Sequence, residues 1–119
     1  MQRQIIAVAG YSADTSKYWY KIFADIKAFG AEVYCVNPKA PQGLEGVYPK
    51  IADLPVKINT LILVVRPELT LQLVKDGLKA GAKDIWFQPR TFDAQAAQTA
   101  KDGGAEVHDG CYMLQNGIW

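Results

Sequence analysis

Short apolar runs recur along the chain and alternate with stretches of helical periodicity. Five runs are rich in β-branched or aromatic residues, as strands buried on both faces of a parallel sheet are. These runs are Gln4–Ala9, Glu32–Val36, Thr60–Val65, Asp84–Phe87 and Ala105–His108. Strands that alternate with helices predict an α/β fold in which helices cover both faces of the sheet. We therefore expect one doubly wound, Rossmann-like domain over residues 1–119, with a mostly parallel five-stranded sheet.

The helical segments carry start and stop signals. The first is predicted from near Ser16 to Phe29, with Asp14, Thr15 or Ser16 as its cap and Gly30 as its end. Its apolar stripe has the spacing i, i+3, i+4, i+7: Trp19, Ile22, Phe23 and Ile26. A second helix is predicted to begin at Pro67 and a third to span Asp93–Lys101, which Gly103 and Gly104 end. The segment 37–59 holds four prolines and is expected to be mostly irregular, with one helical turn near Lys50–Leu54.

Composition excludes several classes of function. The formal net charge is +1, so nothing favours binding to nucleic acid or to an anionic membrane. No apolar run approaches the ~20 residues of a membrane span, and Met1 leads directly into a strand without a signal peptide. The two cysteines lack metal-ligand spacing, and one histidine cannot complete a usual zinc set. We expect a cytoplasmic protein without a bound metal, in which Cys35 is a buried strand residue.

The first predicted strand runs into Gly10-Tyr11-Ser12, and a helix follows within a few residues. A strand, a glycine turn and a helix N-terminus can together hold a phosphate, because backbone N–H groups point at the anion. Ser12 can donate to a phosphate oxygen and Lys17 can add charge. Only one glycine is present, so an alternative is a purely structural turn with a solvated Lys17.

The second predicted strand ends at Asn37-Pro38-Lys39, where an NAD-binding unit would place an acid for the ribose hydroxyls. Asn37 can hydrogen-bond an adenine or ribose edge, and Lys39 can meet an extra phosphate on the ribose. The alternative is a plain turn that ends the strand. The pattern indicates a nucleotide-like ligand and argues against ordinary NAD.

Further polar residues follow the later strands. Arg66, in Arg66-Pro67-Glu68, can bind phosphate, cap a carbonyl or pair with Glu68. In Trp86-Phe87-Gln88, the aromatic residues are expected in the core, and Gln88 can face the cleft. His108, Asp109 and Cys111 hold the residue types of a catalytic triad, but adjacent strand residues point to opposite faces, so no catalytic residue is assigned. Cys111 can still line the cleft as a reactive thiol. The apolar tail 112–119 is expected to pack back or to form a dimer contact.

Several of these segments together resemble the small stand-alone CoA-binding domain proteins, whose fold is similar to the CoA-binding domain of the succinyl-CoA ligase alpha subunit. The matching segments follow the family's order over nearly the whole chain: Ala7–Ser12, Val36–Pro38, Gly46–Pro49, Ile51–Pro55, Arg66–Glu68, Gly81–Lys83, Trp86–Gln88 and Gly110–Met113. The sequence departs from the family at Tyr11, where a small residue is usual, at Gln88-Pro89-Arg90, and in a tail that lacks basic residues.

The resemblance implies that coenzyme A, or an acyl-CoA, lies over the carboxyl edge of the sheet. Gly10, Tyr11, Ser12 and Lys17 would hold the pyrophosphate. Asn37, Pro38 and Lys39 would meet the 3′-phosphoadenosine end. The remaining implied residues are Val65, Arg66 and Pro67 on the cleft floor, and Gln88 and Cys111 toward the pantetheine end.

Three functions fit these observations. A non-catalytic module that binds CoA for sensing, carrying or regulation is favoured. One alternative is a subunit of a CoA-ligase-type enzyme, because the ligases it resembles use a phosphorylatable histidine from another domain and a partner chain could supply it. The other is an NAD-type redox sensor on the same fold. A homodimer or a complex with a partner protein is compatible with each function.

Overall fold

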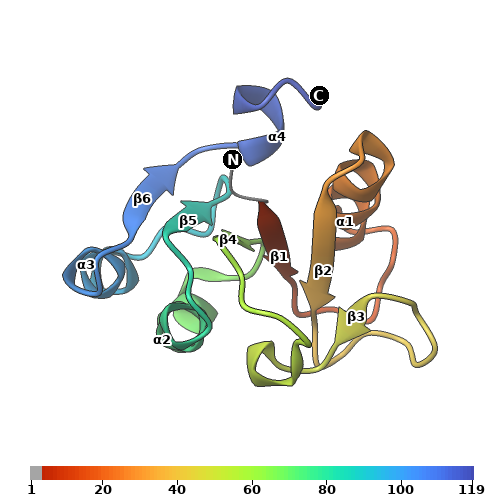
Figure 1. The fold of residues 1–119 in the computed structure, drawn as a ribbon, viewed down its shortest axis with the longest axis horizontal. Coiled ribbons are helices and arrows are strands. Elements are labelled where there is room, and N and C mark those ends of the chain that lie inside the picture. The colour runs from red at the N-terminus through yellow and green to blue at the C-terminus, as the bar shows by residue number, and fades with distance from the viewer. Residues whose placement is uncertain (1–3) are drawn as a thin grey trace.

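The computed structural model describes residues 4–119, and its centre is a six-stranded sheet in the order β3-β2-β1-β4-β5-β6 (Figure 1). All five neighbouring pairs are parallel. The strands are β1 (Ile5–Ala9), β2 (Glu32–Val36), β3 (Val47–Tyr48), β4 (Thr60–Leu63), β5 (Asp84–Phe87) and β6 (Glu106–Asp109). The doubly wound α/β prediction is confirmed, because the chain runs outward from β1 in one direction and then returns to build the other half.

The expected five-stranded sheet is wrong by one strand. The segment 37–59, expected to be irregular apart from one turn, contributes the two-residue β3, in which Val47 and Tyr48 pair with Cys35 and Val36. A strand this short carries no periodicity that the sequence could reveal, and its pairing with β2 comes from tertiary structure. The helical turn expected near Lys50–Leu54 is present as the 3₁₀ turn η1 (Ile51–Asp53).

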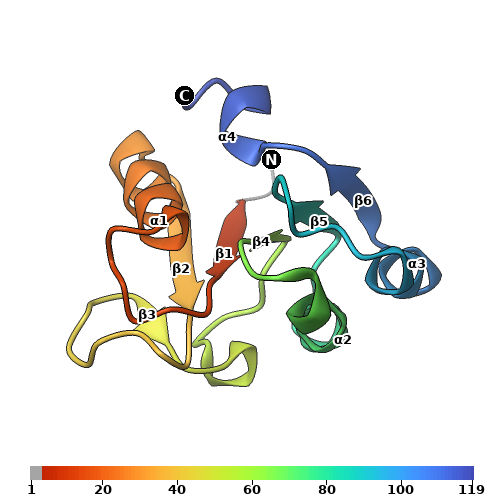
Figure 2. The ribbon, with the colours of Figure 1, turned by 180° about the vertical axis from the view of Figure 1, so that it is seen from behind.

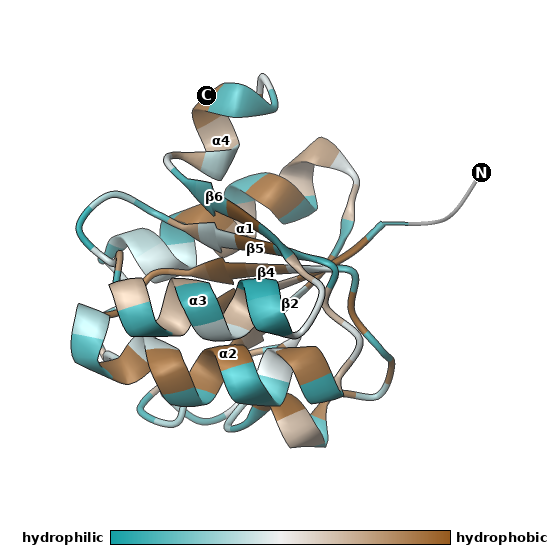
Figure 3. Cartoon of the chain, turned by 90° about the vertical axis from the view of Figure 1, so that its left-hand side faces the viewer, coloured by the Kyte–Doolittle hydropathy of each residue, from teal (hydrophilic) through white to brown (hydrophobic). Residues whose placement is uncertain are grey.

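Four helices cover the two faces of the sheet. They are α1 (Tyr18–Phe29), α2 (Thr70–Lys79), α3 (Ala94–Asp102) and α4 (Tyr112–Gln115), and the 3₁₀ turn η2 (Pro67–Leu69) leads into α2. Helices α1 and α4 lie on one side of the sheet, and α2 and α3 lie on the other (Figures 1 and 3). Seen from behind, the same arrangement places the C-terminus near α1 (Figure 2). Within residues 4–119, no helix combines the length and apolar character that crossing a bilayer requires.

The core forms two clusters, one on each face of the sheet. The cluster under α1 and α4 includes Ile6, Val8, Cys35, Ile62 and Met113, and the predicted stripe of α1 is buried in it. The cluster under α2 and α3 is built by the alternate strand residues, together with Val74 and three alanines of α3. Because successive strand residues face opposite sides, each central strand supplies both clusters, which is why these runs are apolar throughout.

The start of α1 differs from the prediction. The helix begins at Tyr18 with Lys17 as its N-cap residue, and no side chain caps it. Asp14 accepts instead from the backbone N–H of Ser16 at 2.9 Å and from its hydroxyl at 2.6 Å, which closes a turn before the helix. The end of α1 is as predicted, since Gly30 has the left-handed φ of 102° that glycine adopts without a steric cost.

Candidate functional site

Three adjoining hollows follow the carboxyl edge of the sheet, where parallel strands deliver their loops. We name them by position: the β2 hollow (about 360 Å³), the central hollow (about 500 Å³) and the C-terminal hollow (about 490 Å³). Tyr11 lines both the β2 and central hollows. Tyr18, Val64, Pro89 and Arg90 line both the central and C-terminal hollows. Shared walls make the three hollows one elongated trough, and doubly wound folds bind ligands at this edge.

The β2 hollow lies between the ends of β1 and β2, η1 and the first turns of α2. Gly10, Tyr11 and Pro38 from the predicted site line it, and so do Val36, Lys50 and Ile51. Asn37 is 3% exposed and lies behind this wall. Its Nδ2 donates to the carbonyl of Ser12 at 2.9 Å, and its Oδ1 accepts from the N–H of Lys39 at 2.9 Å. Asn37 therefore ties the two ligand loops together rather than facing the hollow.

Lys39 lines none of the three hollows. Its Nζ lies 5.0 Å from the centre of the Tyr11 ring, within the range of a cation–π contact. Tyr11 is 42% exposed and separates the β2 hollow from the central hollow. Tyr11, which stands in the glycine turn where a small residue is usual in the family, thus holds the ammonium group of Lys39 beside the trough.

The central hollow gathers positive charge at the start of α1. Ser12, Lys17, Val65 and Arg66 from the predicted site line it, together with Arg90. Among residues 4–119, none of those lining this hollow carries a carboxylate. The first turn of α1 also lacks an acidic residue and a side-chain cap. The N–H of Tyr20 donates to the carbonyl of Lys17 at 3.2 Å, which leaves the N–H groups of Tyr18 and Trp19 for an anion. Arg66 makes only a long contact of 3.9 Å with Glu68, and both side chains are exposed.

Gly10 sets how closely α1 approaches the first strand. A Cβ at this position would lie 2.5 Å from Cβ and 2.6 Å from Cγ of Trp19, far inside normal contact. Trp19 is anchored by its own indole N–H, which donates to the carbonyl of Asp14 at 3.0 Å. The glycine is therefore required by packing, and the same close packing brings the helix start to the edge of the trough.

The C-terminal hollow lies between α1, the end of β5 and the segment 111–119. Gln88 and Cys111 line it with Ile22, Leu114 and Trp119. Gln88 is buried, and its Oε1 accepts from the N–H of Tyr112 at 2.7 Å while its Nε2 lies 3.5 Å from Sγ of Cys111. The amide of Gln88 thereby holds Cys111 at the wall of the hollow.

The tail packs back onto the domain, as one of the two sequence expectations had it. Tyr112 and Met113 are buried, and Trp119 donates through its indole N–H to Asp25 on α1 at 2.7 Å. This hydrogen bond, followed by the one from Lys21, lowers the pKa of Asp25 below its ordinary value of 3.8. The hydrogen bond holds Trp119 against α1, where its side chain forms part of the wall of the C-terminal hollow.

Sequence reasoning missed part of this lining. It did not single out Tyr18, Val64, Arg90, Leu114 or Trp119 as site residues. Tyr18 and Ile22 share one face of α1 at spacing i, i+4, which was a usable signal. Leu114 and Trp119 reach the hollow only because the tail folds over α1. Of the predicted residues, Pro67 lines none of the three hollows and lies in η2 instead.

The single histidine lies away from the trough. His108 Nε2 is 3.2 Å from Oδ1 of Asp84, and the ring stacks on Trp86 with centroids 4.1 Å apart. Glu106 brings a third possible metal ligand, and the three ligand atoms lie within 4.8 Å of one another. His108 thus faces Asp84 rather than Asp109 or Cys111, and the structure does not bring these three residues together as a triad.

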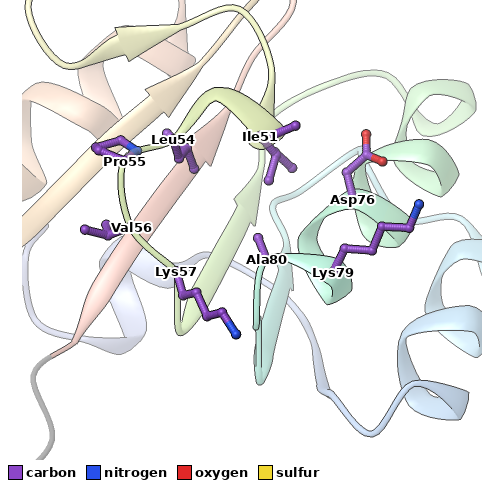
Figure 4. Close-up of a pocket in the computed structure, with 9 residues that line it drawn as sticks. Ile51, Leu54, Pro55, Val56, Lys57, Asp76, Lys79 and Ala80 are labelled. Atoms are coloured by element: carbon purple, nitrogen blue, oxygen red, sulfur yellow. The ribbon is translucent and has the colours of Figure 1, made fainter.

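A fourth hollow of about 440 Å³ lies on the flank of the domain, between the loop after η1 and the end of α2 (Figure 4). Lys57 and Lys79 extend from its two walls, and none of the residues predicted from the sequence lines it. Cys35 is fully buried and lines none of the four hollows, and burial raises the pKa of its thiol to about 12.

Comparison with known proteins agrees with this geometry. The family model described as a CoA binding domain matches residues 4–117, and the chain belongs to that family. The ADP-forming acetate–CoA ligase I of Archaeoglobus fulgidus is 30% identical over 83 residues, which cover 69% of this chain and 12% of the ligase. The alpha subunit of the ADP-forming acetate–CoA ligase II of Pyrococcus furiosus is 28% identical over 104 residues, covering 85% of this chain and 22% of the subunit.

A solved structure of similar size also matches. A protein of Pyrococcus furiosus described as a conserved hypothetical protein superposes with a TM-score of 0.80 at 32% identity, covering 96% of this chain and 99% of that one. The chain therefore corresponds to nearly the whole of one small protein, but spans less than a quarter of either curated relative.

Proposed function

We propose that this chain binds coenzyme A or an acyl-CoA along the trough and acts as a binding module rather than as an enzyme. One observation carries the proposal: a positively charged central hollow, whose lining within residues 4–119 includes no carboxylate, joins two less charged hollows at the carboxyl edge. CoA has the matching order of parts, with a pyrophosphate between an adenosine and a pantetheine arm. The CoA-binding family supports the same ligand.

The order of the hollows suggests how the ligand lies. The adenosine end would enter the β2 hollow beside Pro38, with its 3′-phosphate near Lys39. The pyrophosphate would meet Ser12, Lys17 and the open N-terminus of α1 in the central hollow. Pantetheine would extend past Gln88 toward Cys111 in the C-terminal hollow. Val65 and Arg66 would form the floor beneath the phosphates.

Calorimetric titration with CoA, dephospho-CoA and NAD tests the proposal. We expect saturable binding of CoA, weaker binding of dephospho-CoA and little binding of NAD, because no acid follows β2 to hold the ribose hydroxyls. Lys39→Ala should reduce the preference for CoA over dephospho-CoA by about tenfold, the worth of one charged hydrogen bond. Lys75→Ala, an exposed lysine on α2 that lines no hollow, is the matched control.

Either of two results would contradict this function. Tighter binding of NAD than of CoA would favour the redox-sensing alternative. Failure of all three ligands to bind would leave the carboxyl edge without the proposed role in the isolated chain.

A second candidate is a CoA-binding subunit of a ligase, which the similarity to two ADP-forming acetate–CoA ligases favours. The one histidine of this sequence lies against Asp84, outside the three hollows, so a phosphorylated histidine would have to come from outside these 119 residues. Incubation with acetate, CoA and ATP should give no acetyl-CoA with this chain alone. Formation of acetyl-CoA by the isolated chain would show that it is an autonomous enzyme.

A further inference from the structure

The turn after β5 holds Arg90 in an unusual backbone conformation. Its φ is 75°, the one positive φ at a non-glycine residue in the described part of the chain. The N–H of Thr91 donates to the carbonyl of Gln88 at 3.0 Å, and the Thr91 hydroxyl donates to the same oxygen at 2.5 Å. Proline followed by a positive φ is typical of a type II turn, whose third position normally holds glycine or asparagine. An arginine there is strained by its Cβ.

The strained residue lies where two of the hollows meet. Arg90 is exposed and lines both the central and the C-terminal hollow. No carboxylate within residues 4–119 lies within 4.0 Å of its guanidinium. In the central hollow it joins Lys17 and Arg66, and among residues 4–119 the one carboxylate within 4.0 Å of these three cations is that of Glu68, 3.9 Å from Arg66. Such a gathering of like charge is unfavourable until an anion enters.

We propose that Arg90 is a further ligand-binding residue, whose guanidinium binds phosphate oxygens of CoA where the ligand passes from the central to the C-terminal hollow. The inference rests on the proposed function. A guanidinium presents paired N–H donors that match phosphate oxygens, which suits it to this junction. Glycine would relax the turn but would remove those donors. The strained turn thus lowers the stability of the fold, whereas the charge raises the affinity for CoA. Substitutions at Arg90 can separate these two effects.

Three substitutions at this position separate the two effects. Arg90→Gly removes strain and charge, so the midpoint of thermal unfolding should rise by about 2–5 °C while CoA affinity falls about tenfold or more. Arg90→Ala removes the charge alone, so affinity should fall similarly without that rise. Arg90→Lys keeps the strain and the charge, so the affinity of this variant for CoA should stay within about threefold of that of the unmodified chain. Lys75→Ala is again the exposed-lysine control.

Titration of each variant with CoA and dephospho-CoA gives the decisive readout. The affinity loss at Arg90 should be the same for both ligands, because the 3′-phosphate belongs to the opposite end of the trough. Unchanged CoA affinity in Arg90→Ala, with the unmodified chain binding CoA, would overturn the role of Arg90 and leave the proposed function standing. Failure of the unmodified chain to bind CoA would overturn both, and it is seen before any variant is compared.

Discussion

Helices α1 and α3 both begin at the carboxyl edge of the sheet, but their first turns are completed differently. Asp93 caps α3, since its carboxylate accepts from the N–H of Ala96 at 2.9 Å. The start of α1 has Lys17 at the same position and no side-chain acceptor. The carboxylate of Asp14, three residues before Lys17, accepts instead from Ser16 in the preceding turn. The chain therefore caps one helix internally and leaves the other open beside the cationic hollow.

The contrast distinguishes a helix N-terminus that can bind an anion from one that is capped within the fold. A carboxylate cap accepts from one N–H group of a helix start and offsets the positive end of the dipole, so such a start attracts an anion less. A helix start that has a lysine in place of a carboxylate cap attracts an anion from a ligand, because its positive charge is not offset. Mutation can close the start of α1 and open the start of α3.

The placement of the open start depends on Gly10. Gly10→Ala would force a methyl group against Trp19 and should lower the free energy of unfolding by about 1–3 kcal/mol. Urea unfolding measures the loss, and CoA affinity should fall with it because α1 moves away from the first strand. Gly110→Ala is the matched control, since its methyl group would meet only the end of the Gln115 side chain at 3.3 Å. Equal effects of the two variants would refute the packing role.

Closing α1 with a carboxylate should abolish its anion site. Lys17→Asp places a capping residue where α3 has one, so the free protein should gain about 0.5–1 kcal/mol of stability. CoA affinity should fall by about 100-fold, because a cation is lost and a carboxylate competes for the same N–H groups. Calorimetry with CoA checks the loss, and Lys17→Ser, which caps without charge, should be intermediate. Retained affinity in Lys17→Asp would mean that the anion binds elsewhere.

Opening α3 should affect stability alone. Asp93→Ala removes the acceptor for Ala96 and should cost about 1 kcal/mol. CoA affinity should stay unchanged, because Asp93 lines none of the three hollows. Urea unfolding and calorimetry on the same sample separate the two quantities. A drop in CoA affinity beyond twofold would show that both helix starts serve the ligand.

The smallest effect concerns the turn before α1. The hydroxyl of Ser16, then its backbone N–H and the charge of Lys17, lower the pKa of Asp14 below its ordinary value of 3.8. The lowered pKa means that this turn stabilises the fold above pH 3.8 and loses its contribution as the pH falls through the lowered value. The Ser16 amide resonance should report that titration, and Asp14→Asn should remove it. A midpoint at or above 3.8 would contradict the assignment.

The hydrophobic periodicity of the sequence was enough to predict the architecture. Alternating strands and helices predicted the doubly wound sheet, and the stripe on α1 is buried as expected. The two-residue β3 and the start of α1 were not predictable. A pair of residues has no period, and three candidate caps in a row cannot be ranked without knowing which N–H groups they face.

The candidate site could be predicted only in part, because the partners of a side chain depend on packing. Residues that directly follow the strands, such as Ser12, Arg66 and Gln88, were found because parallel strands must deliver their loops to one edge. Lys39 and Asn37 also follow a strand, yet one contacts Tyr11 and the other links two loops. Strand position predicts the neighbourhood of a side chain, but its partners depend on packing.

Hydrophobic period and residue type are local properties, so they predicted the fold class, the edge that carries the ligand loops and the missing acid for NAD. Three features became visible only in the folded chain: the tail lines one hollow, α1 begins without a side-chain cap, and Arg90 occupies a left-handed turn where two hollows meet. Those features depend on contacts between segments far apart in the chain, and such contacts are fixed only when the whole core is packed.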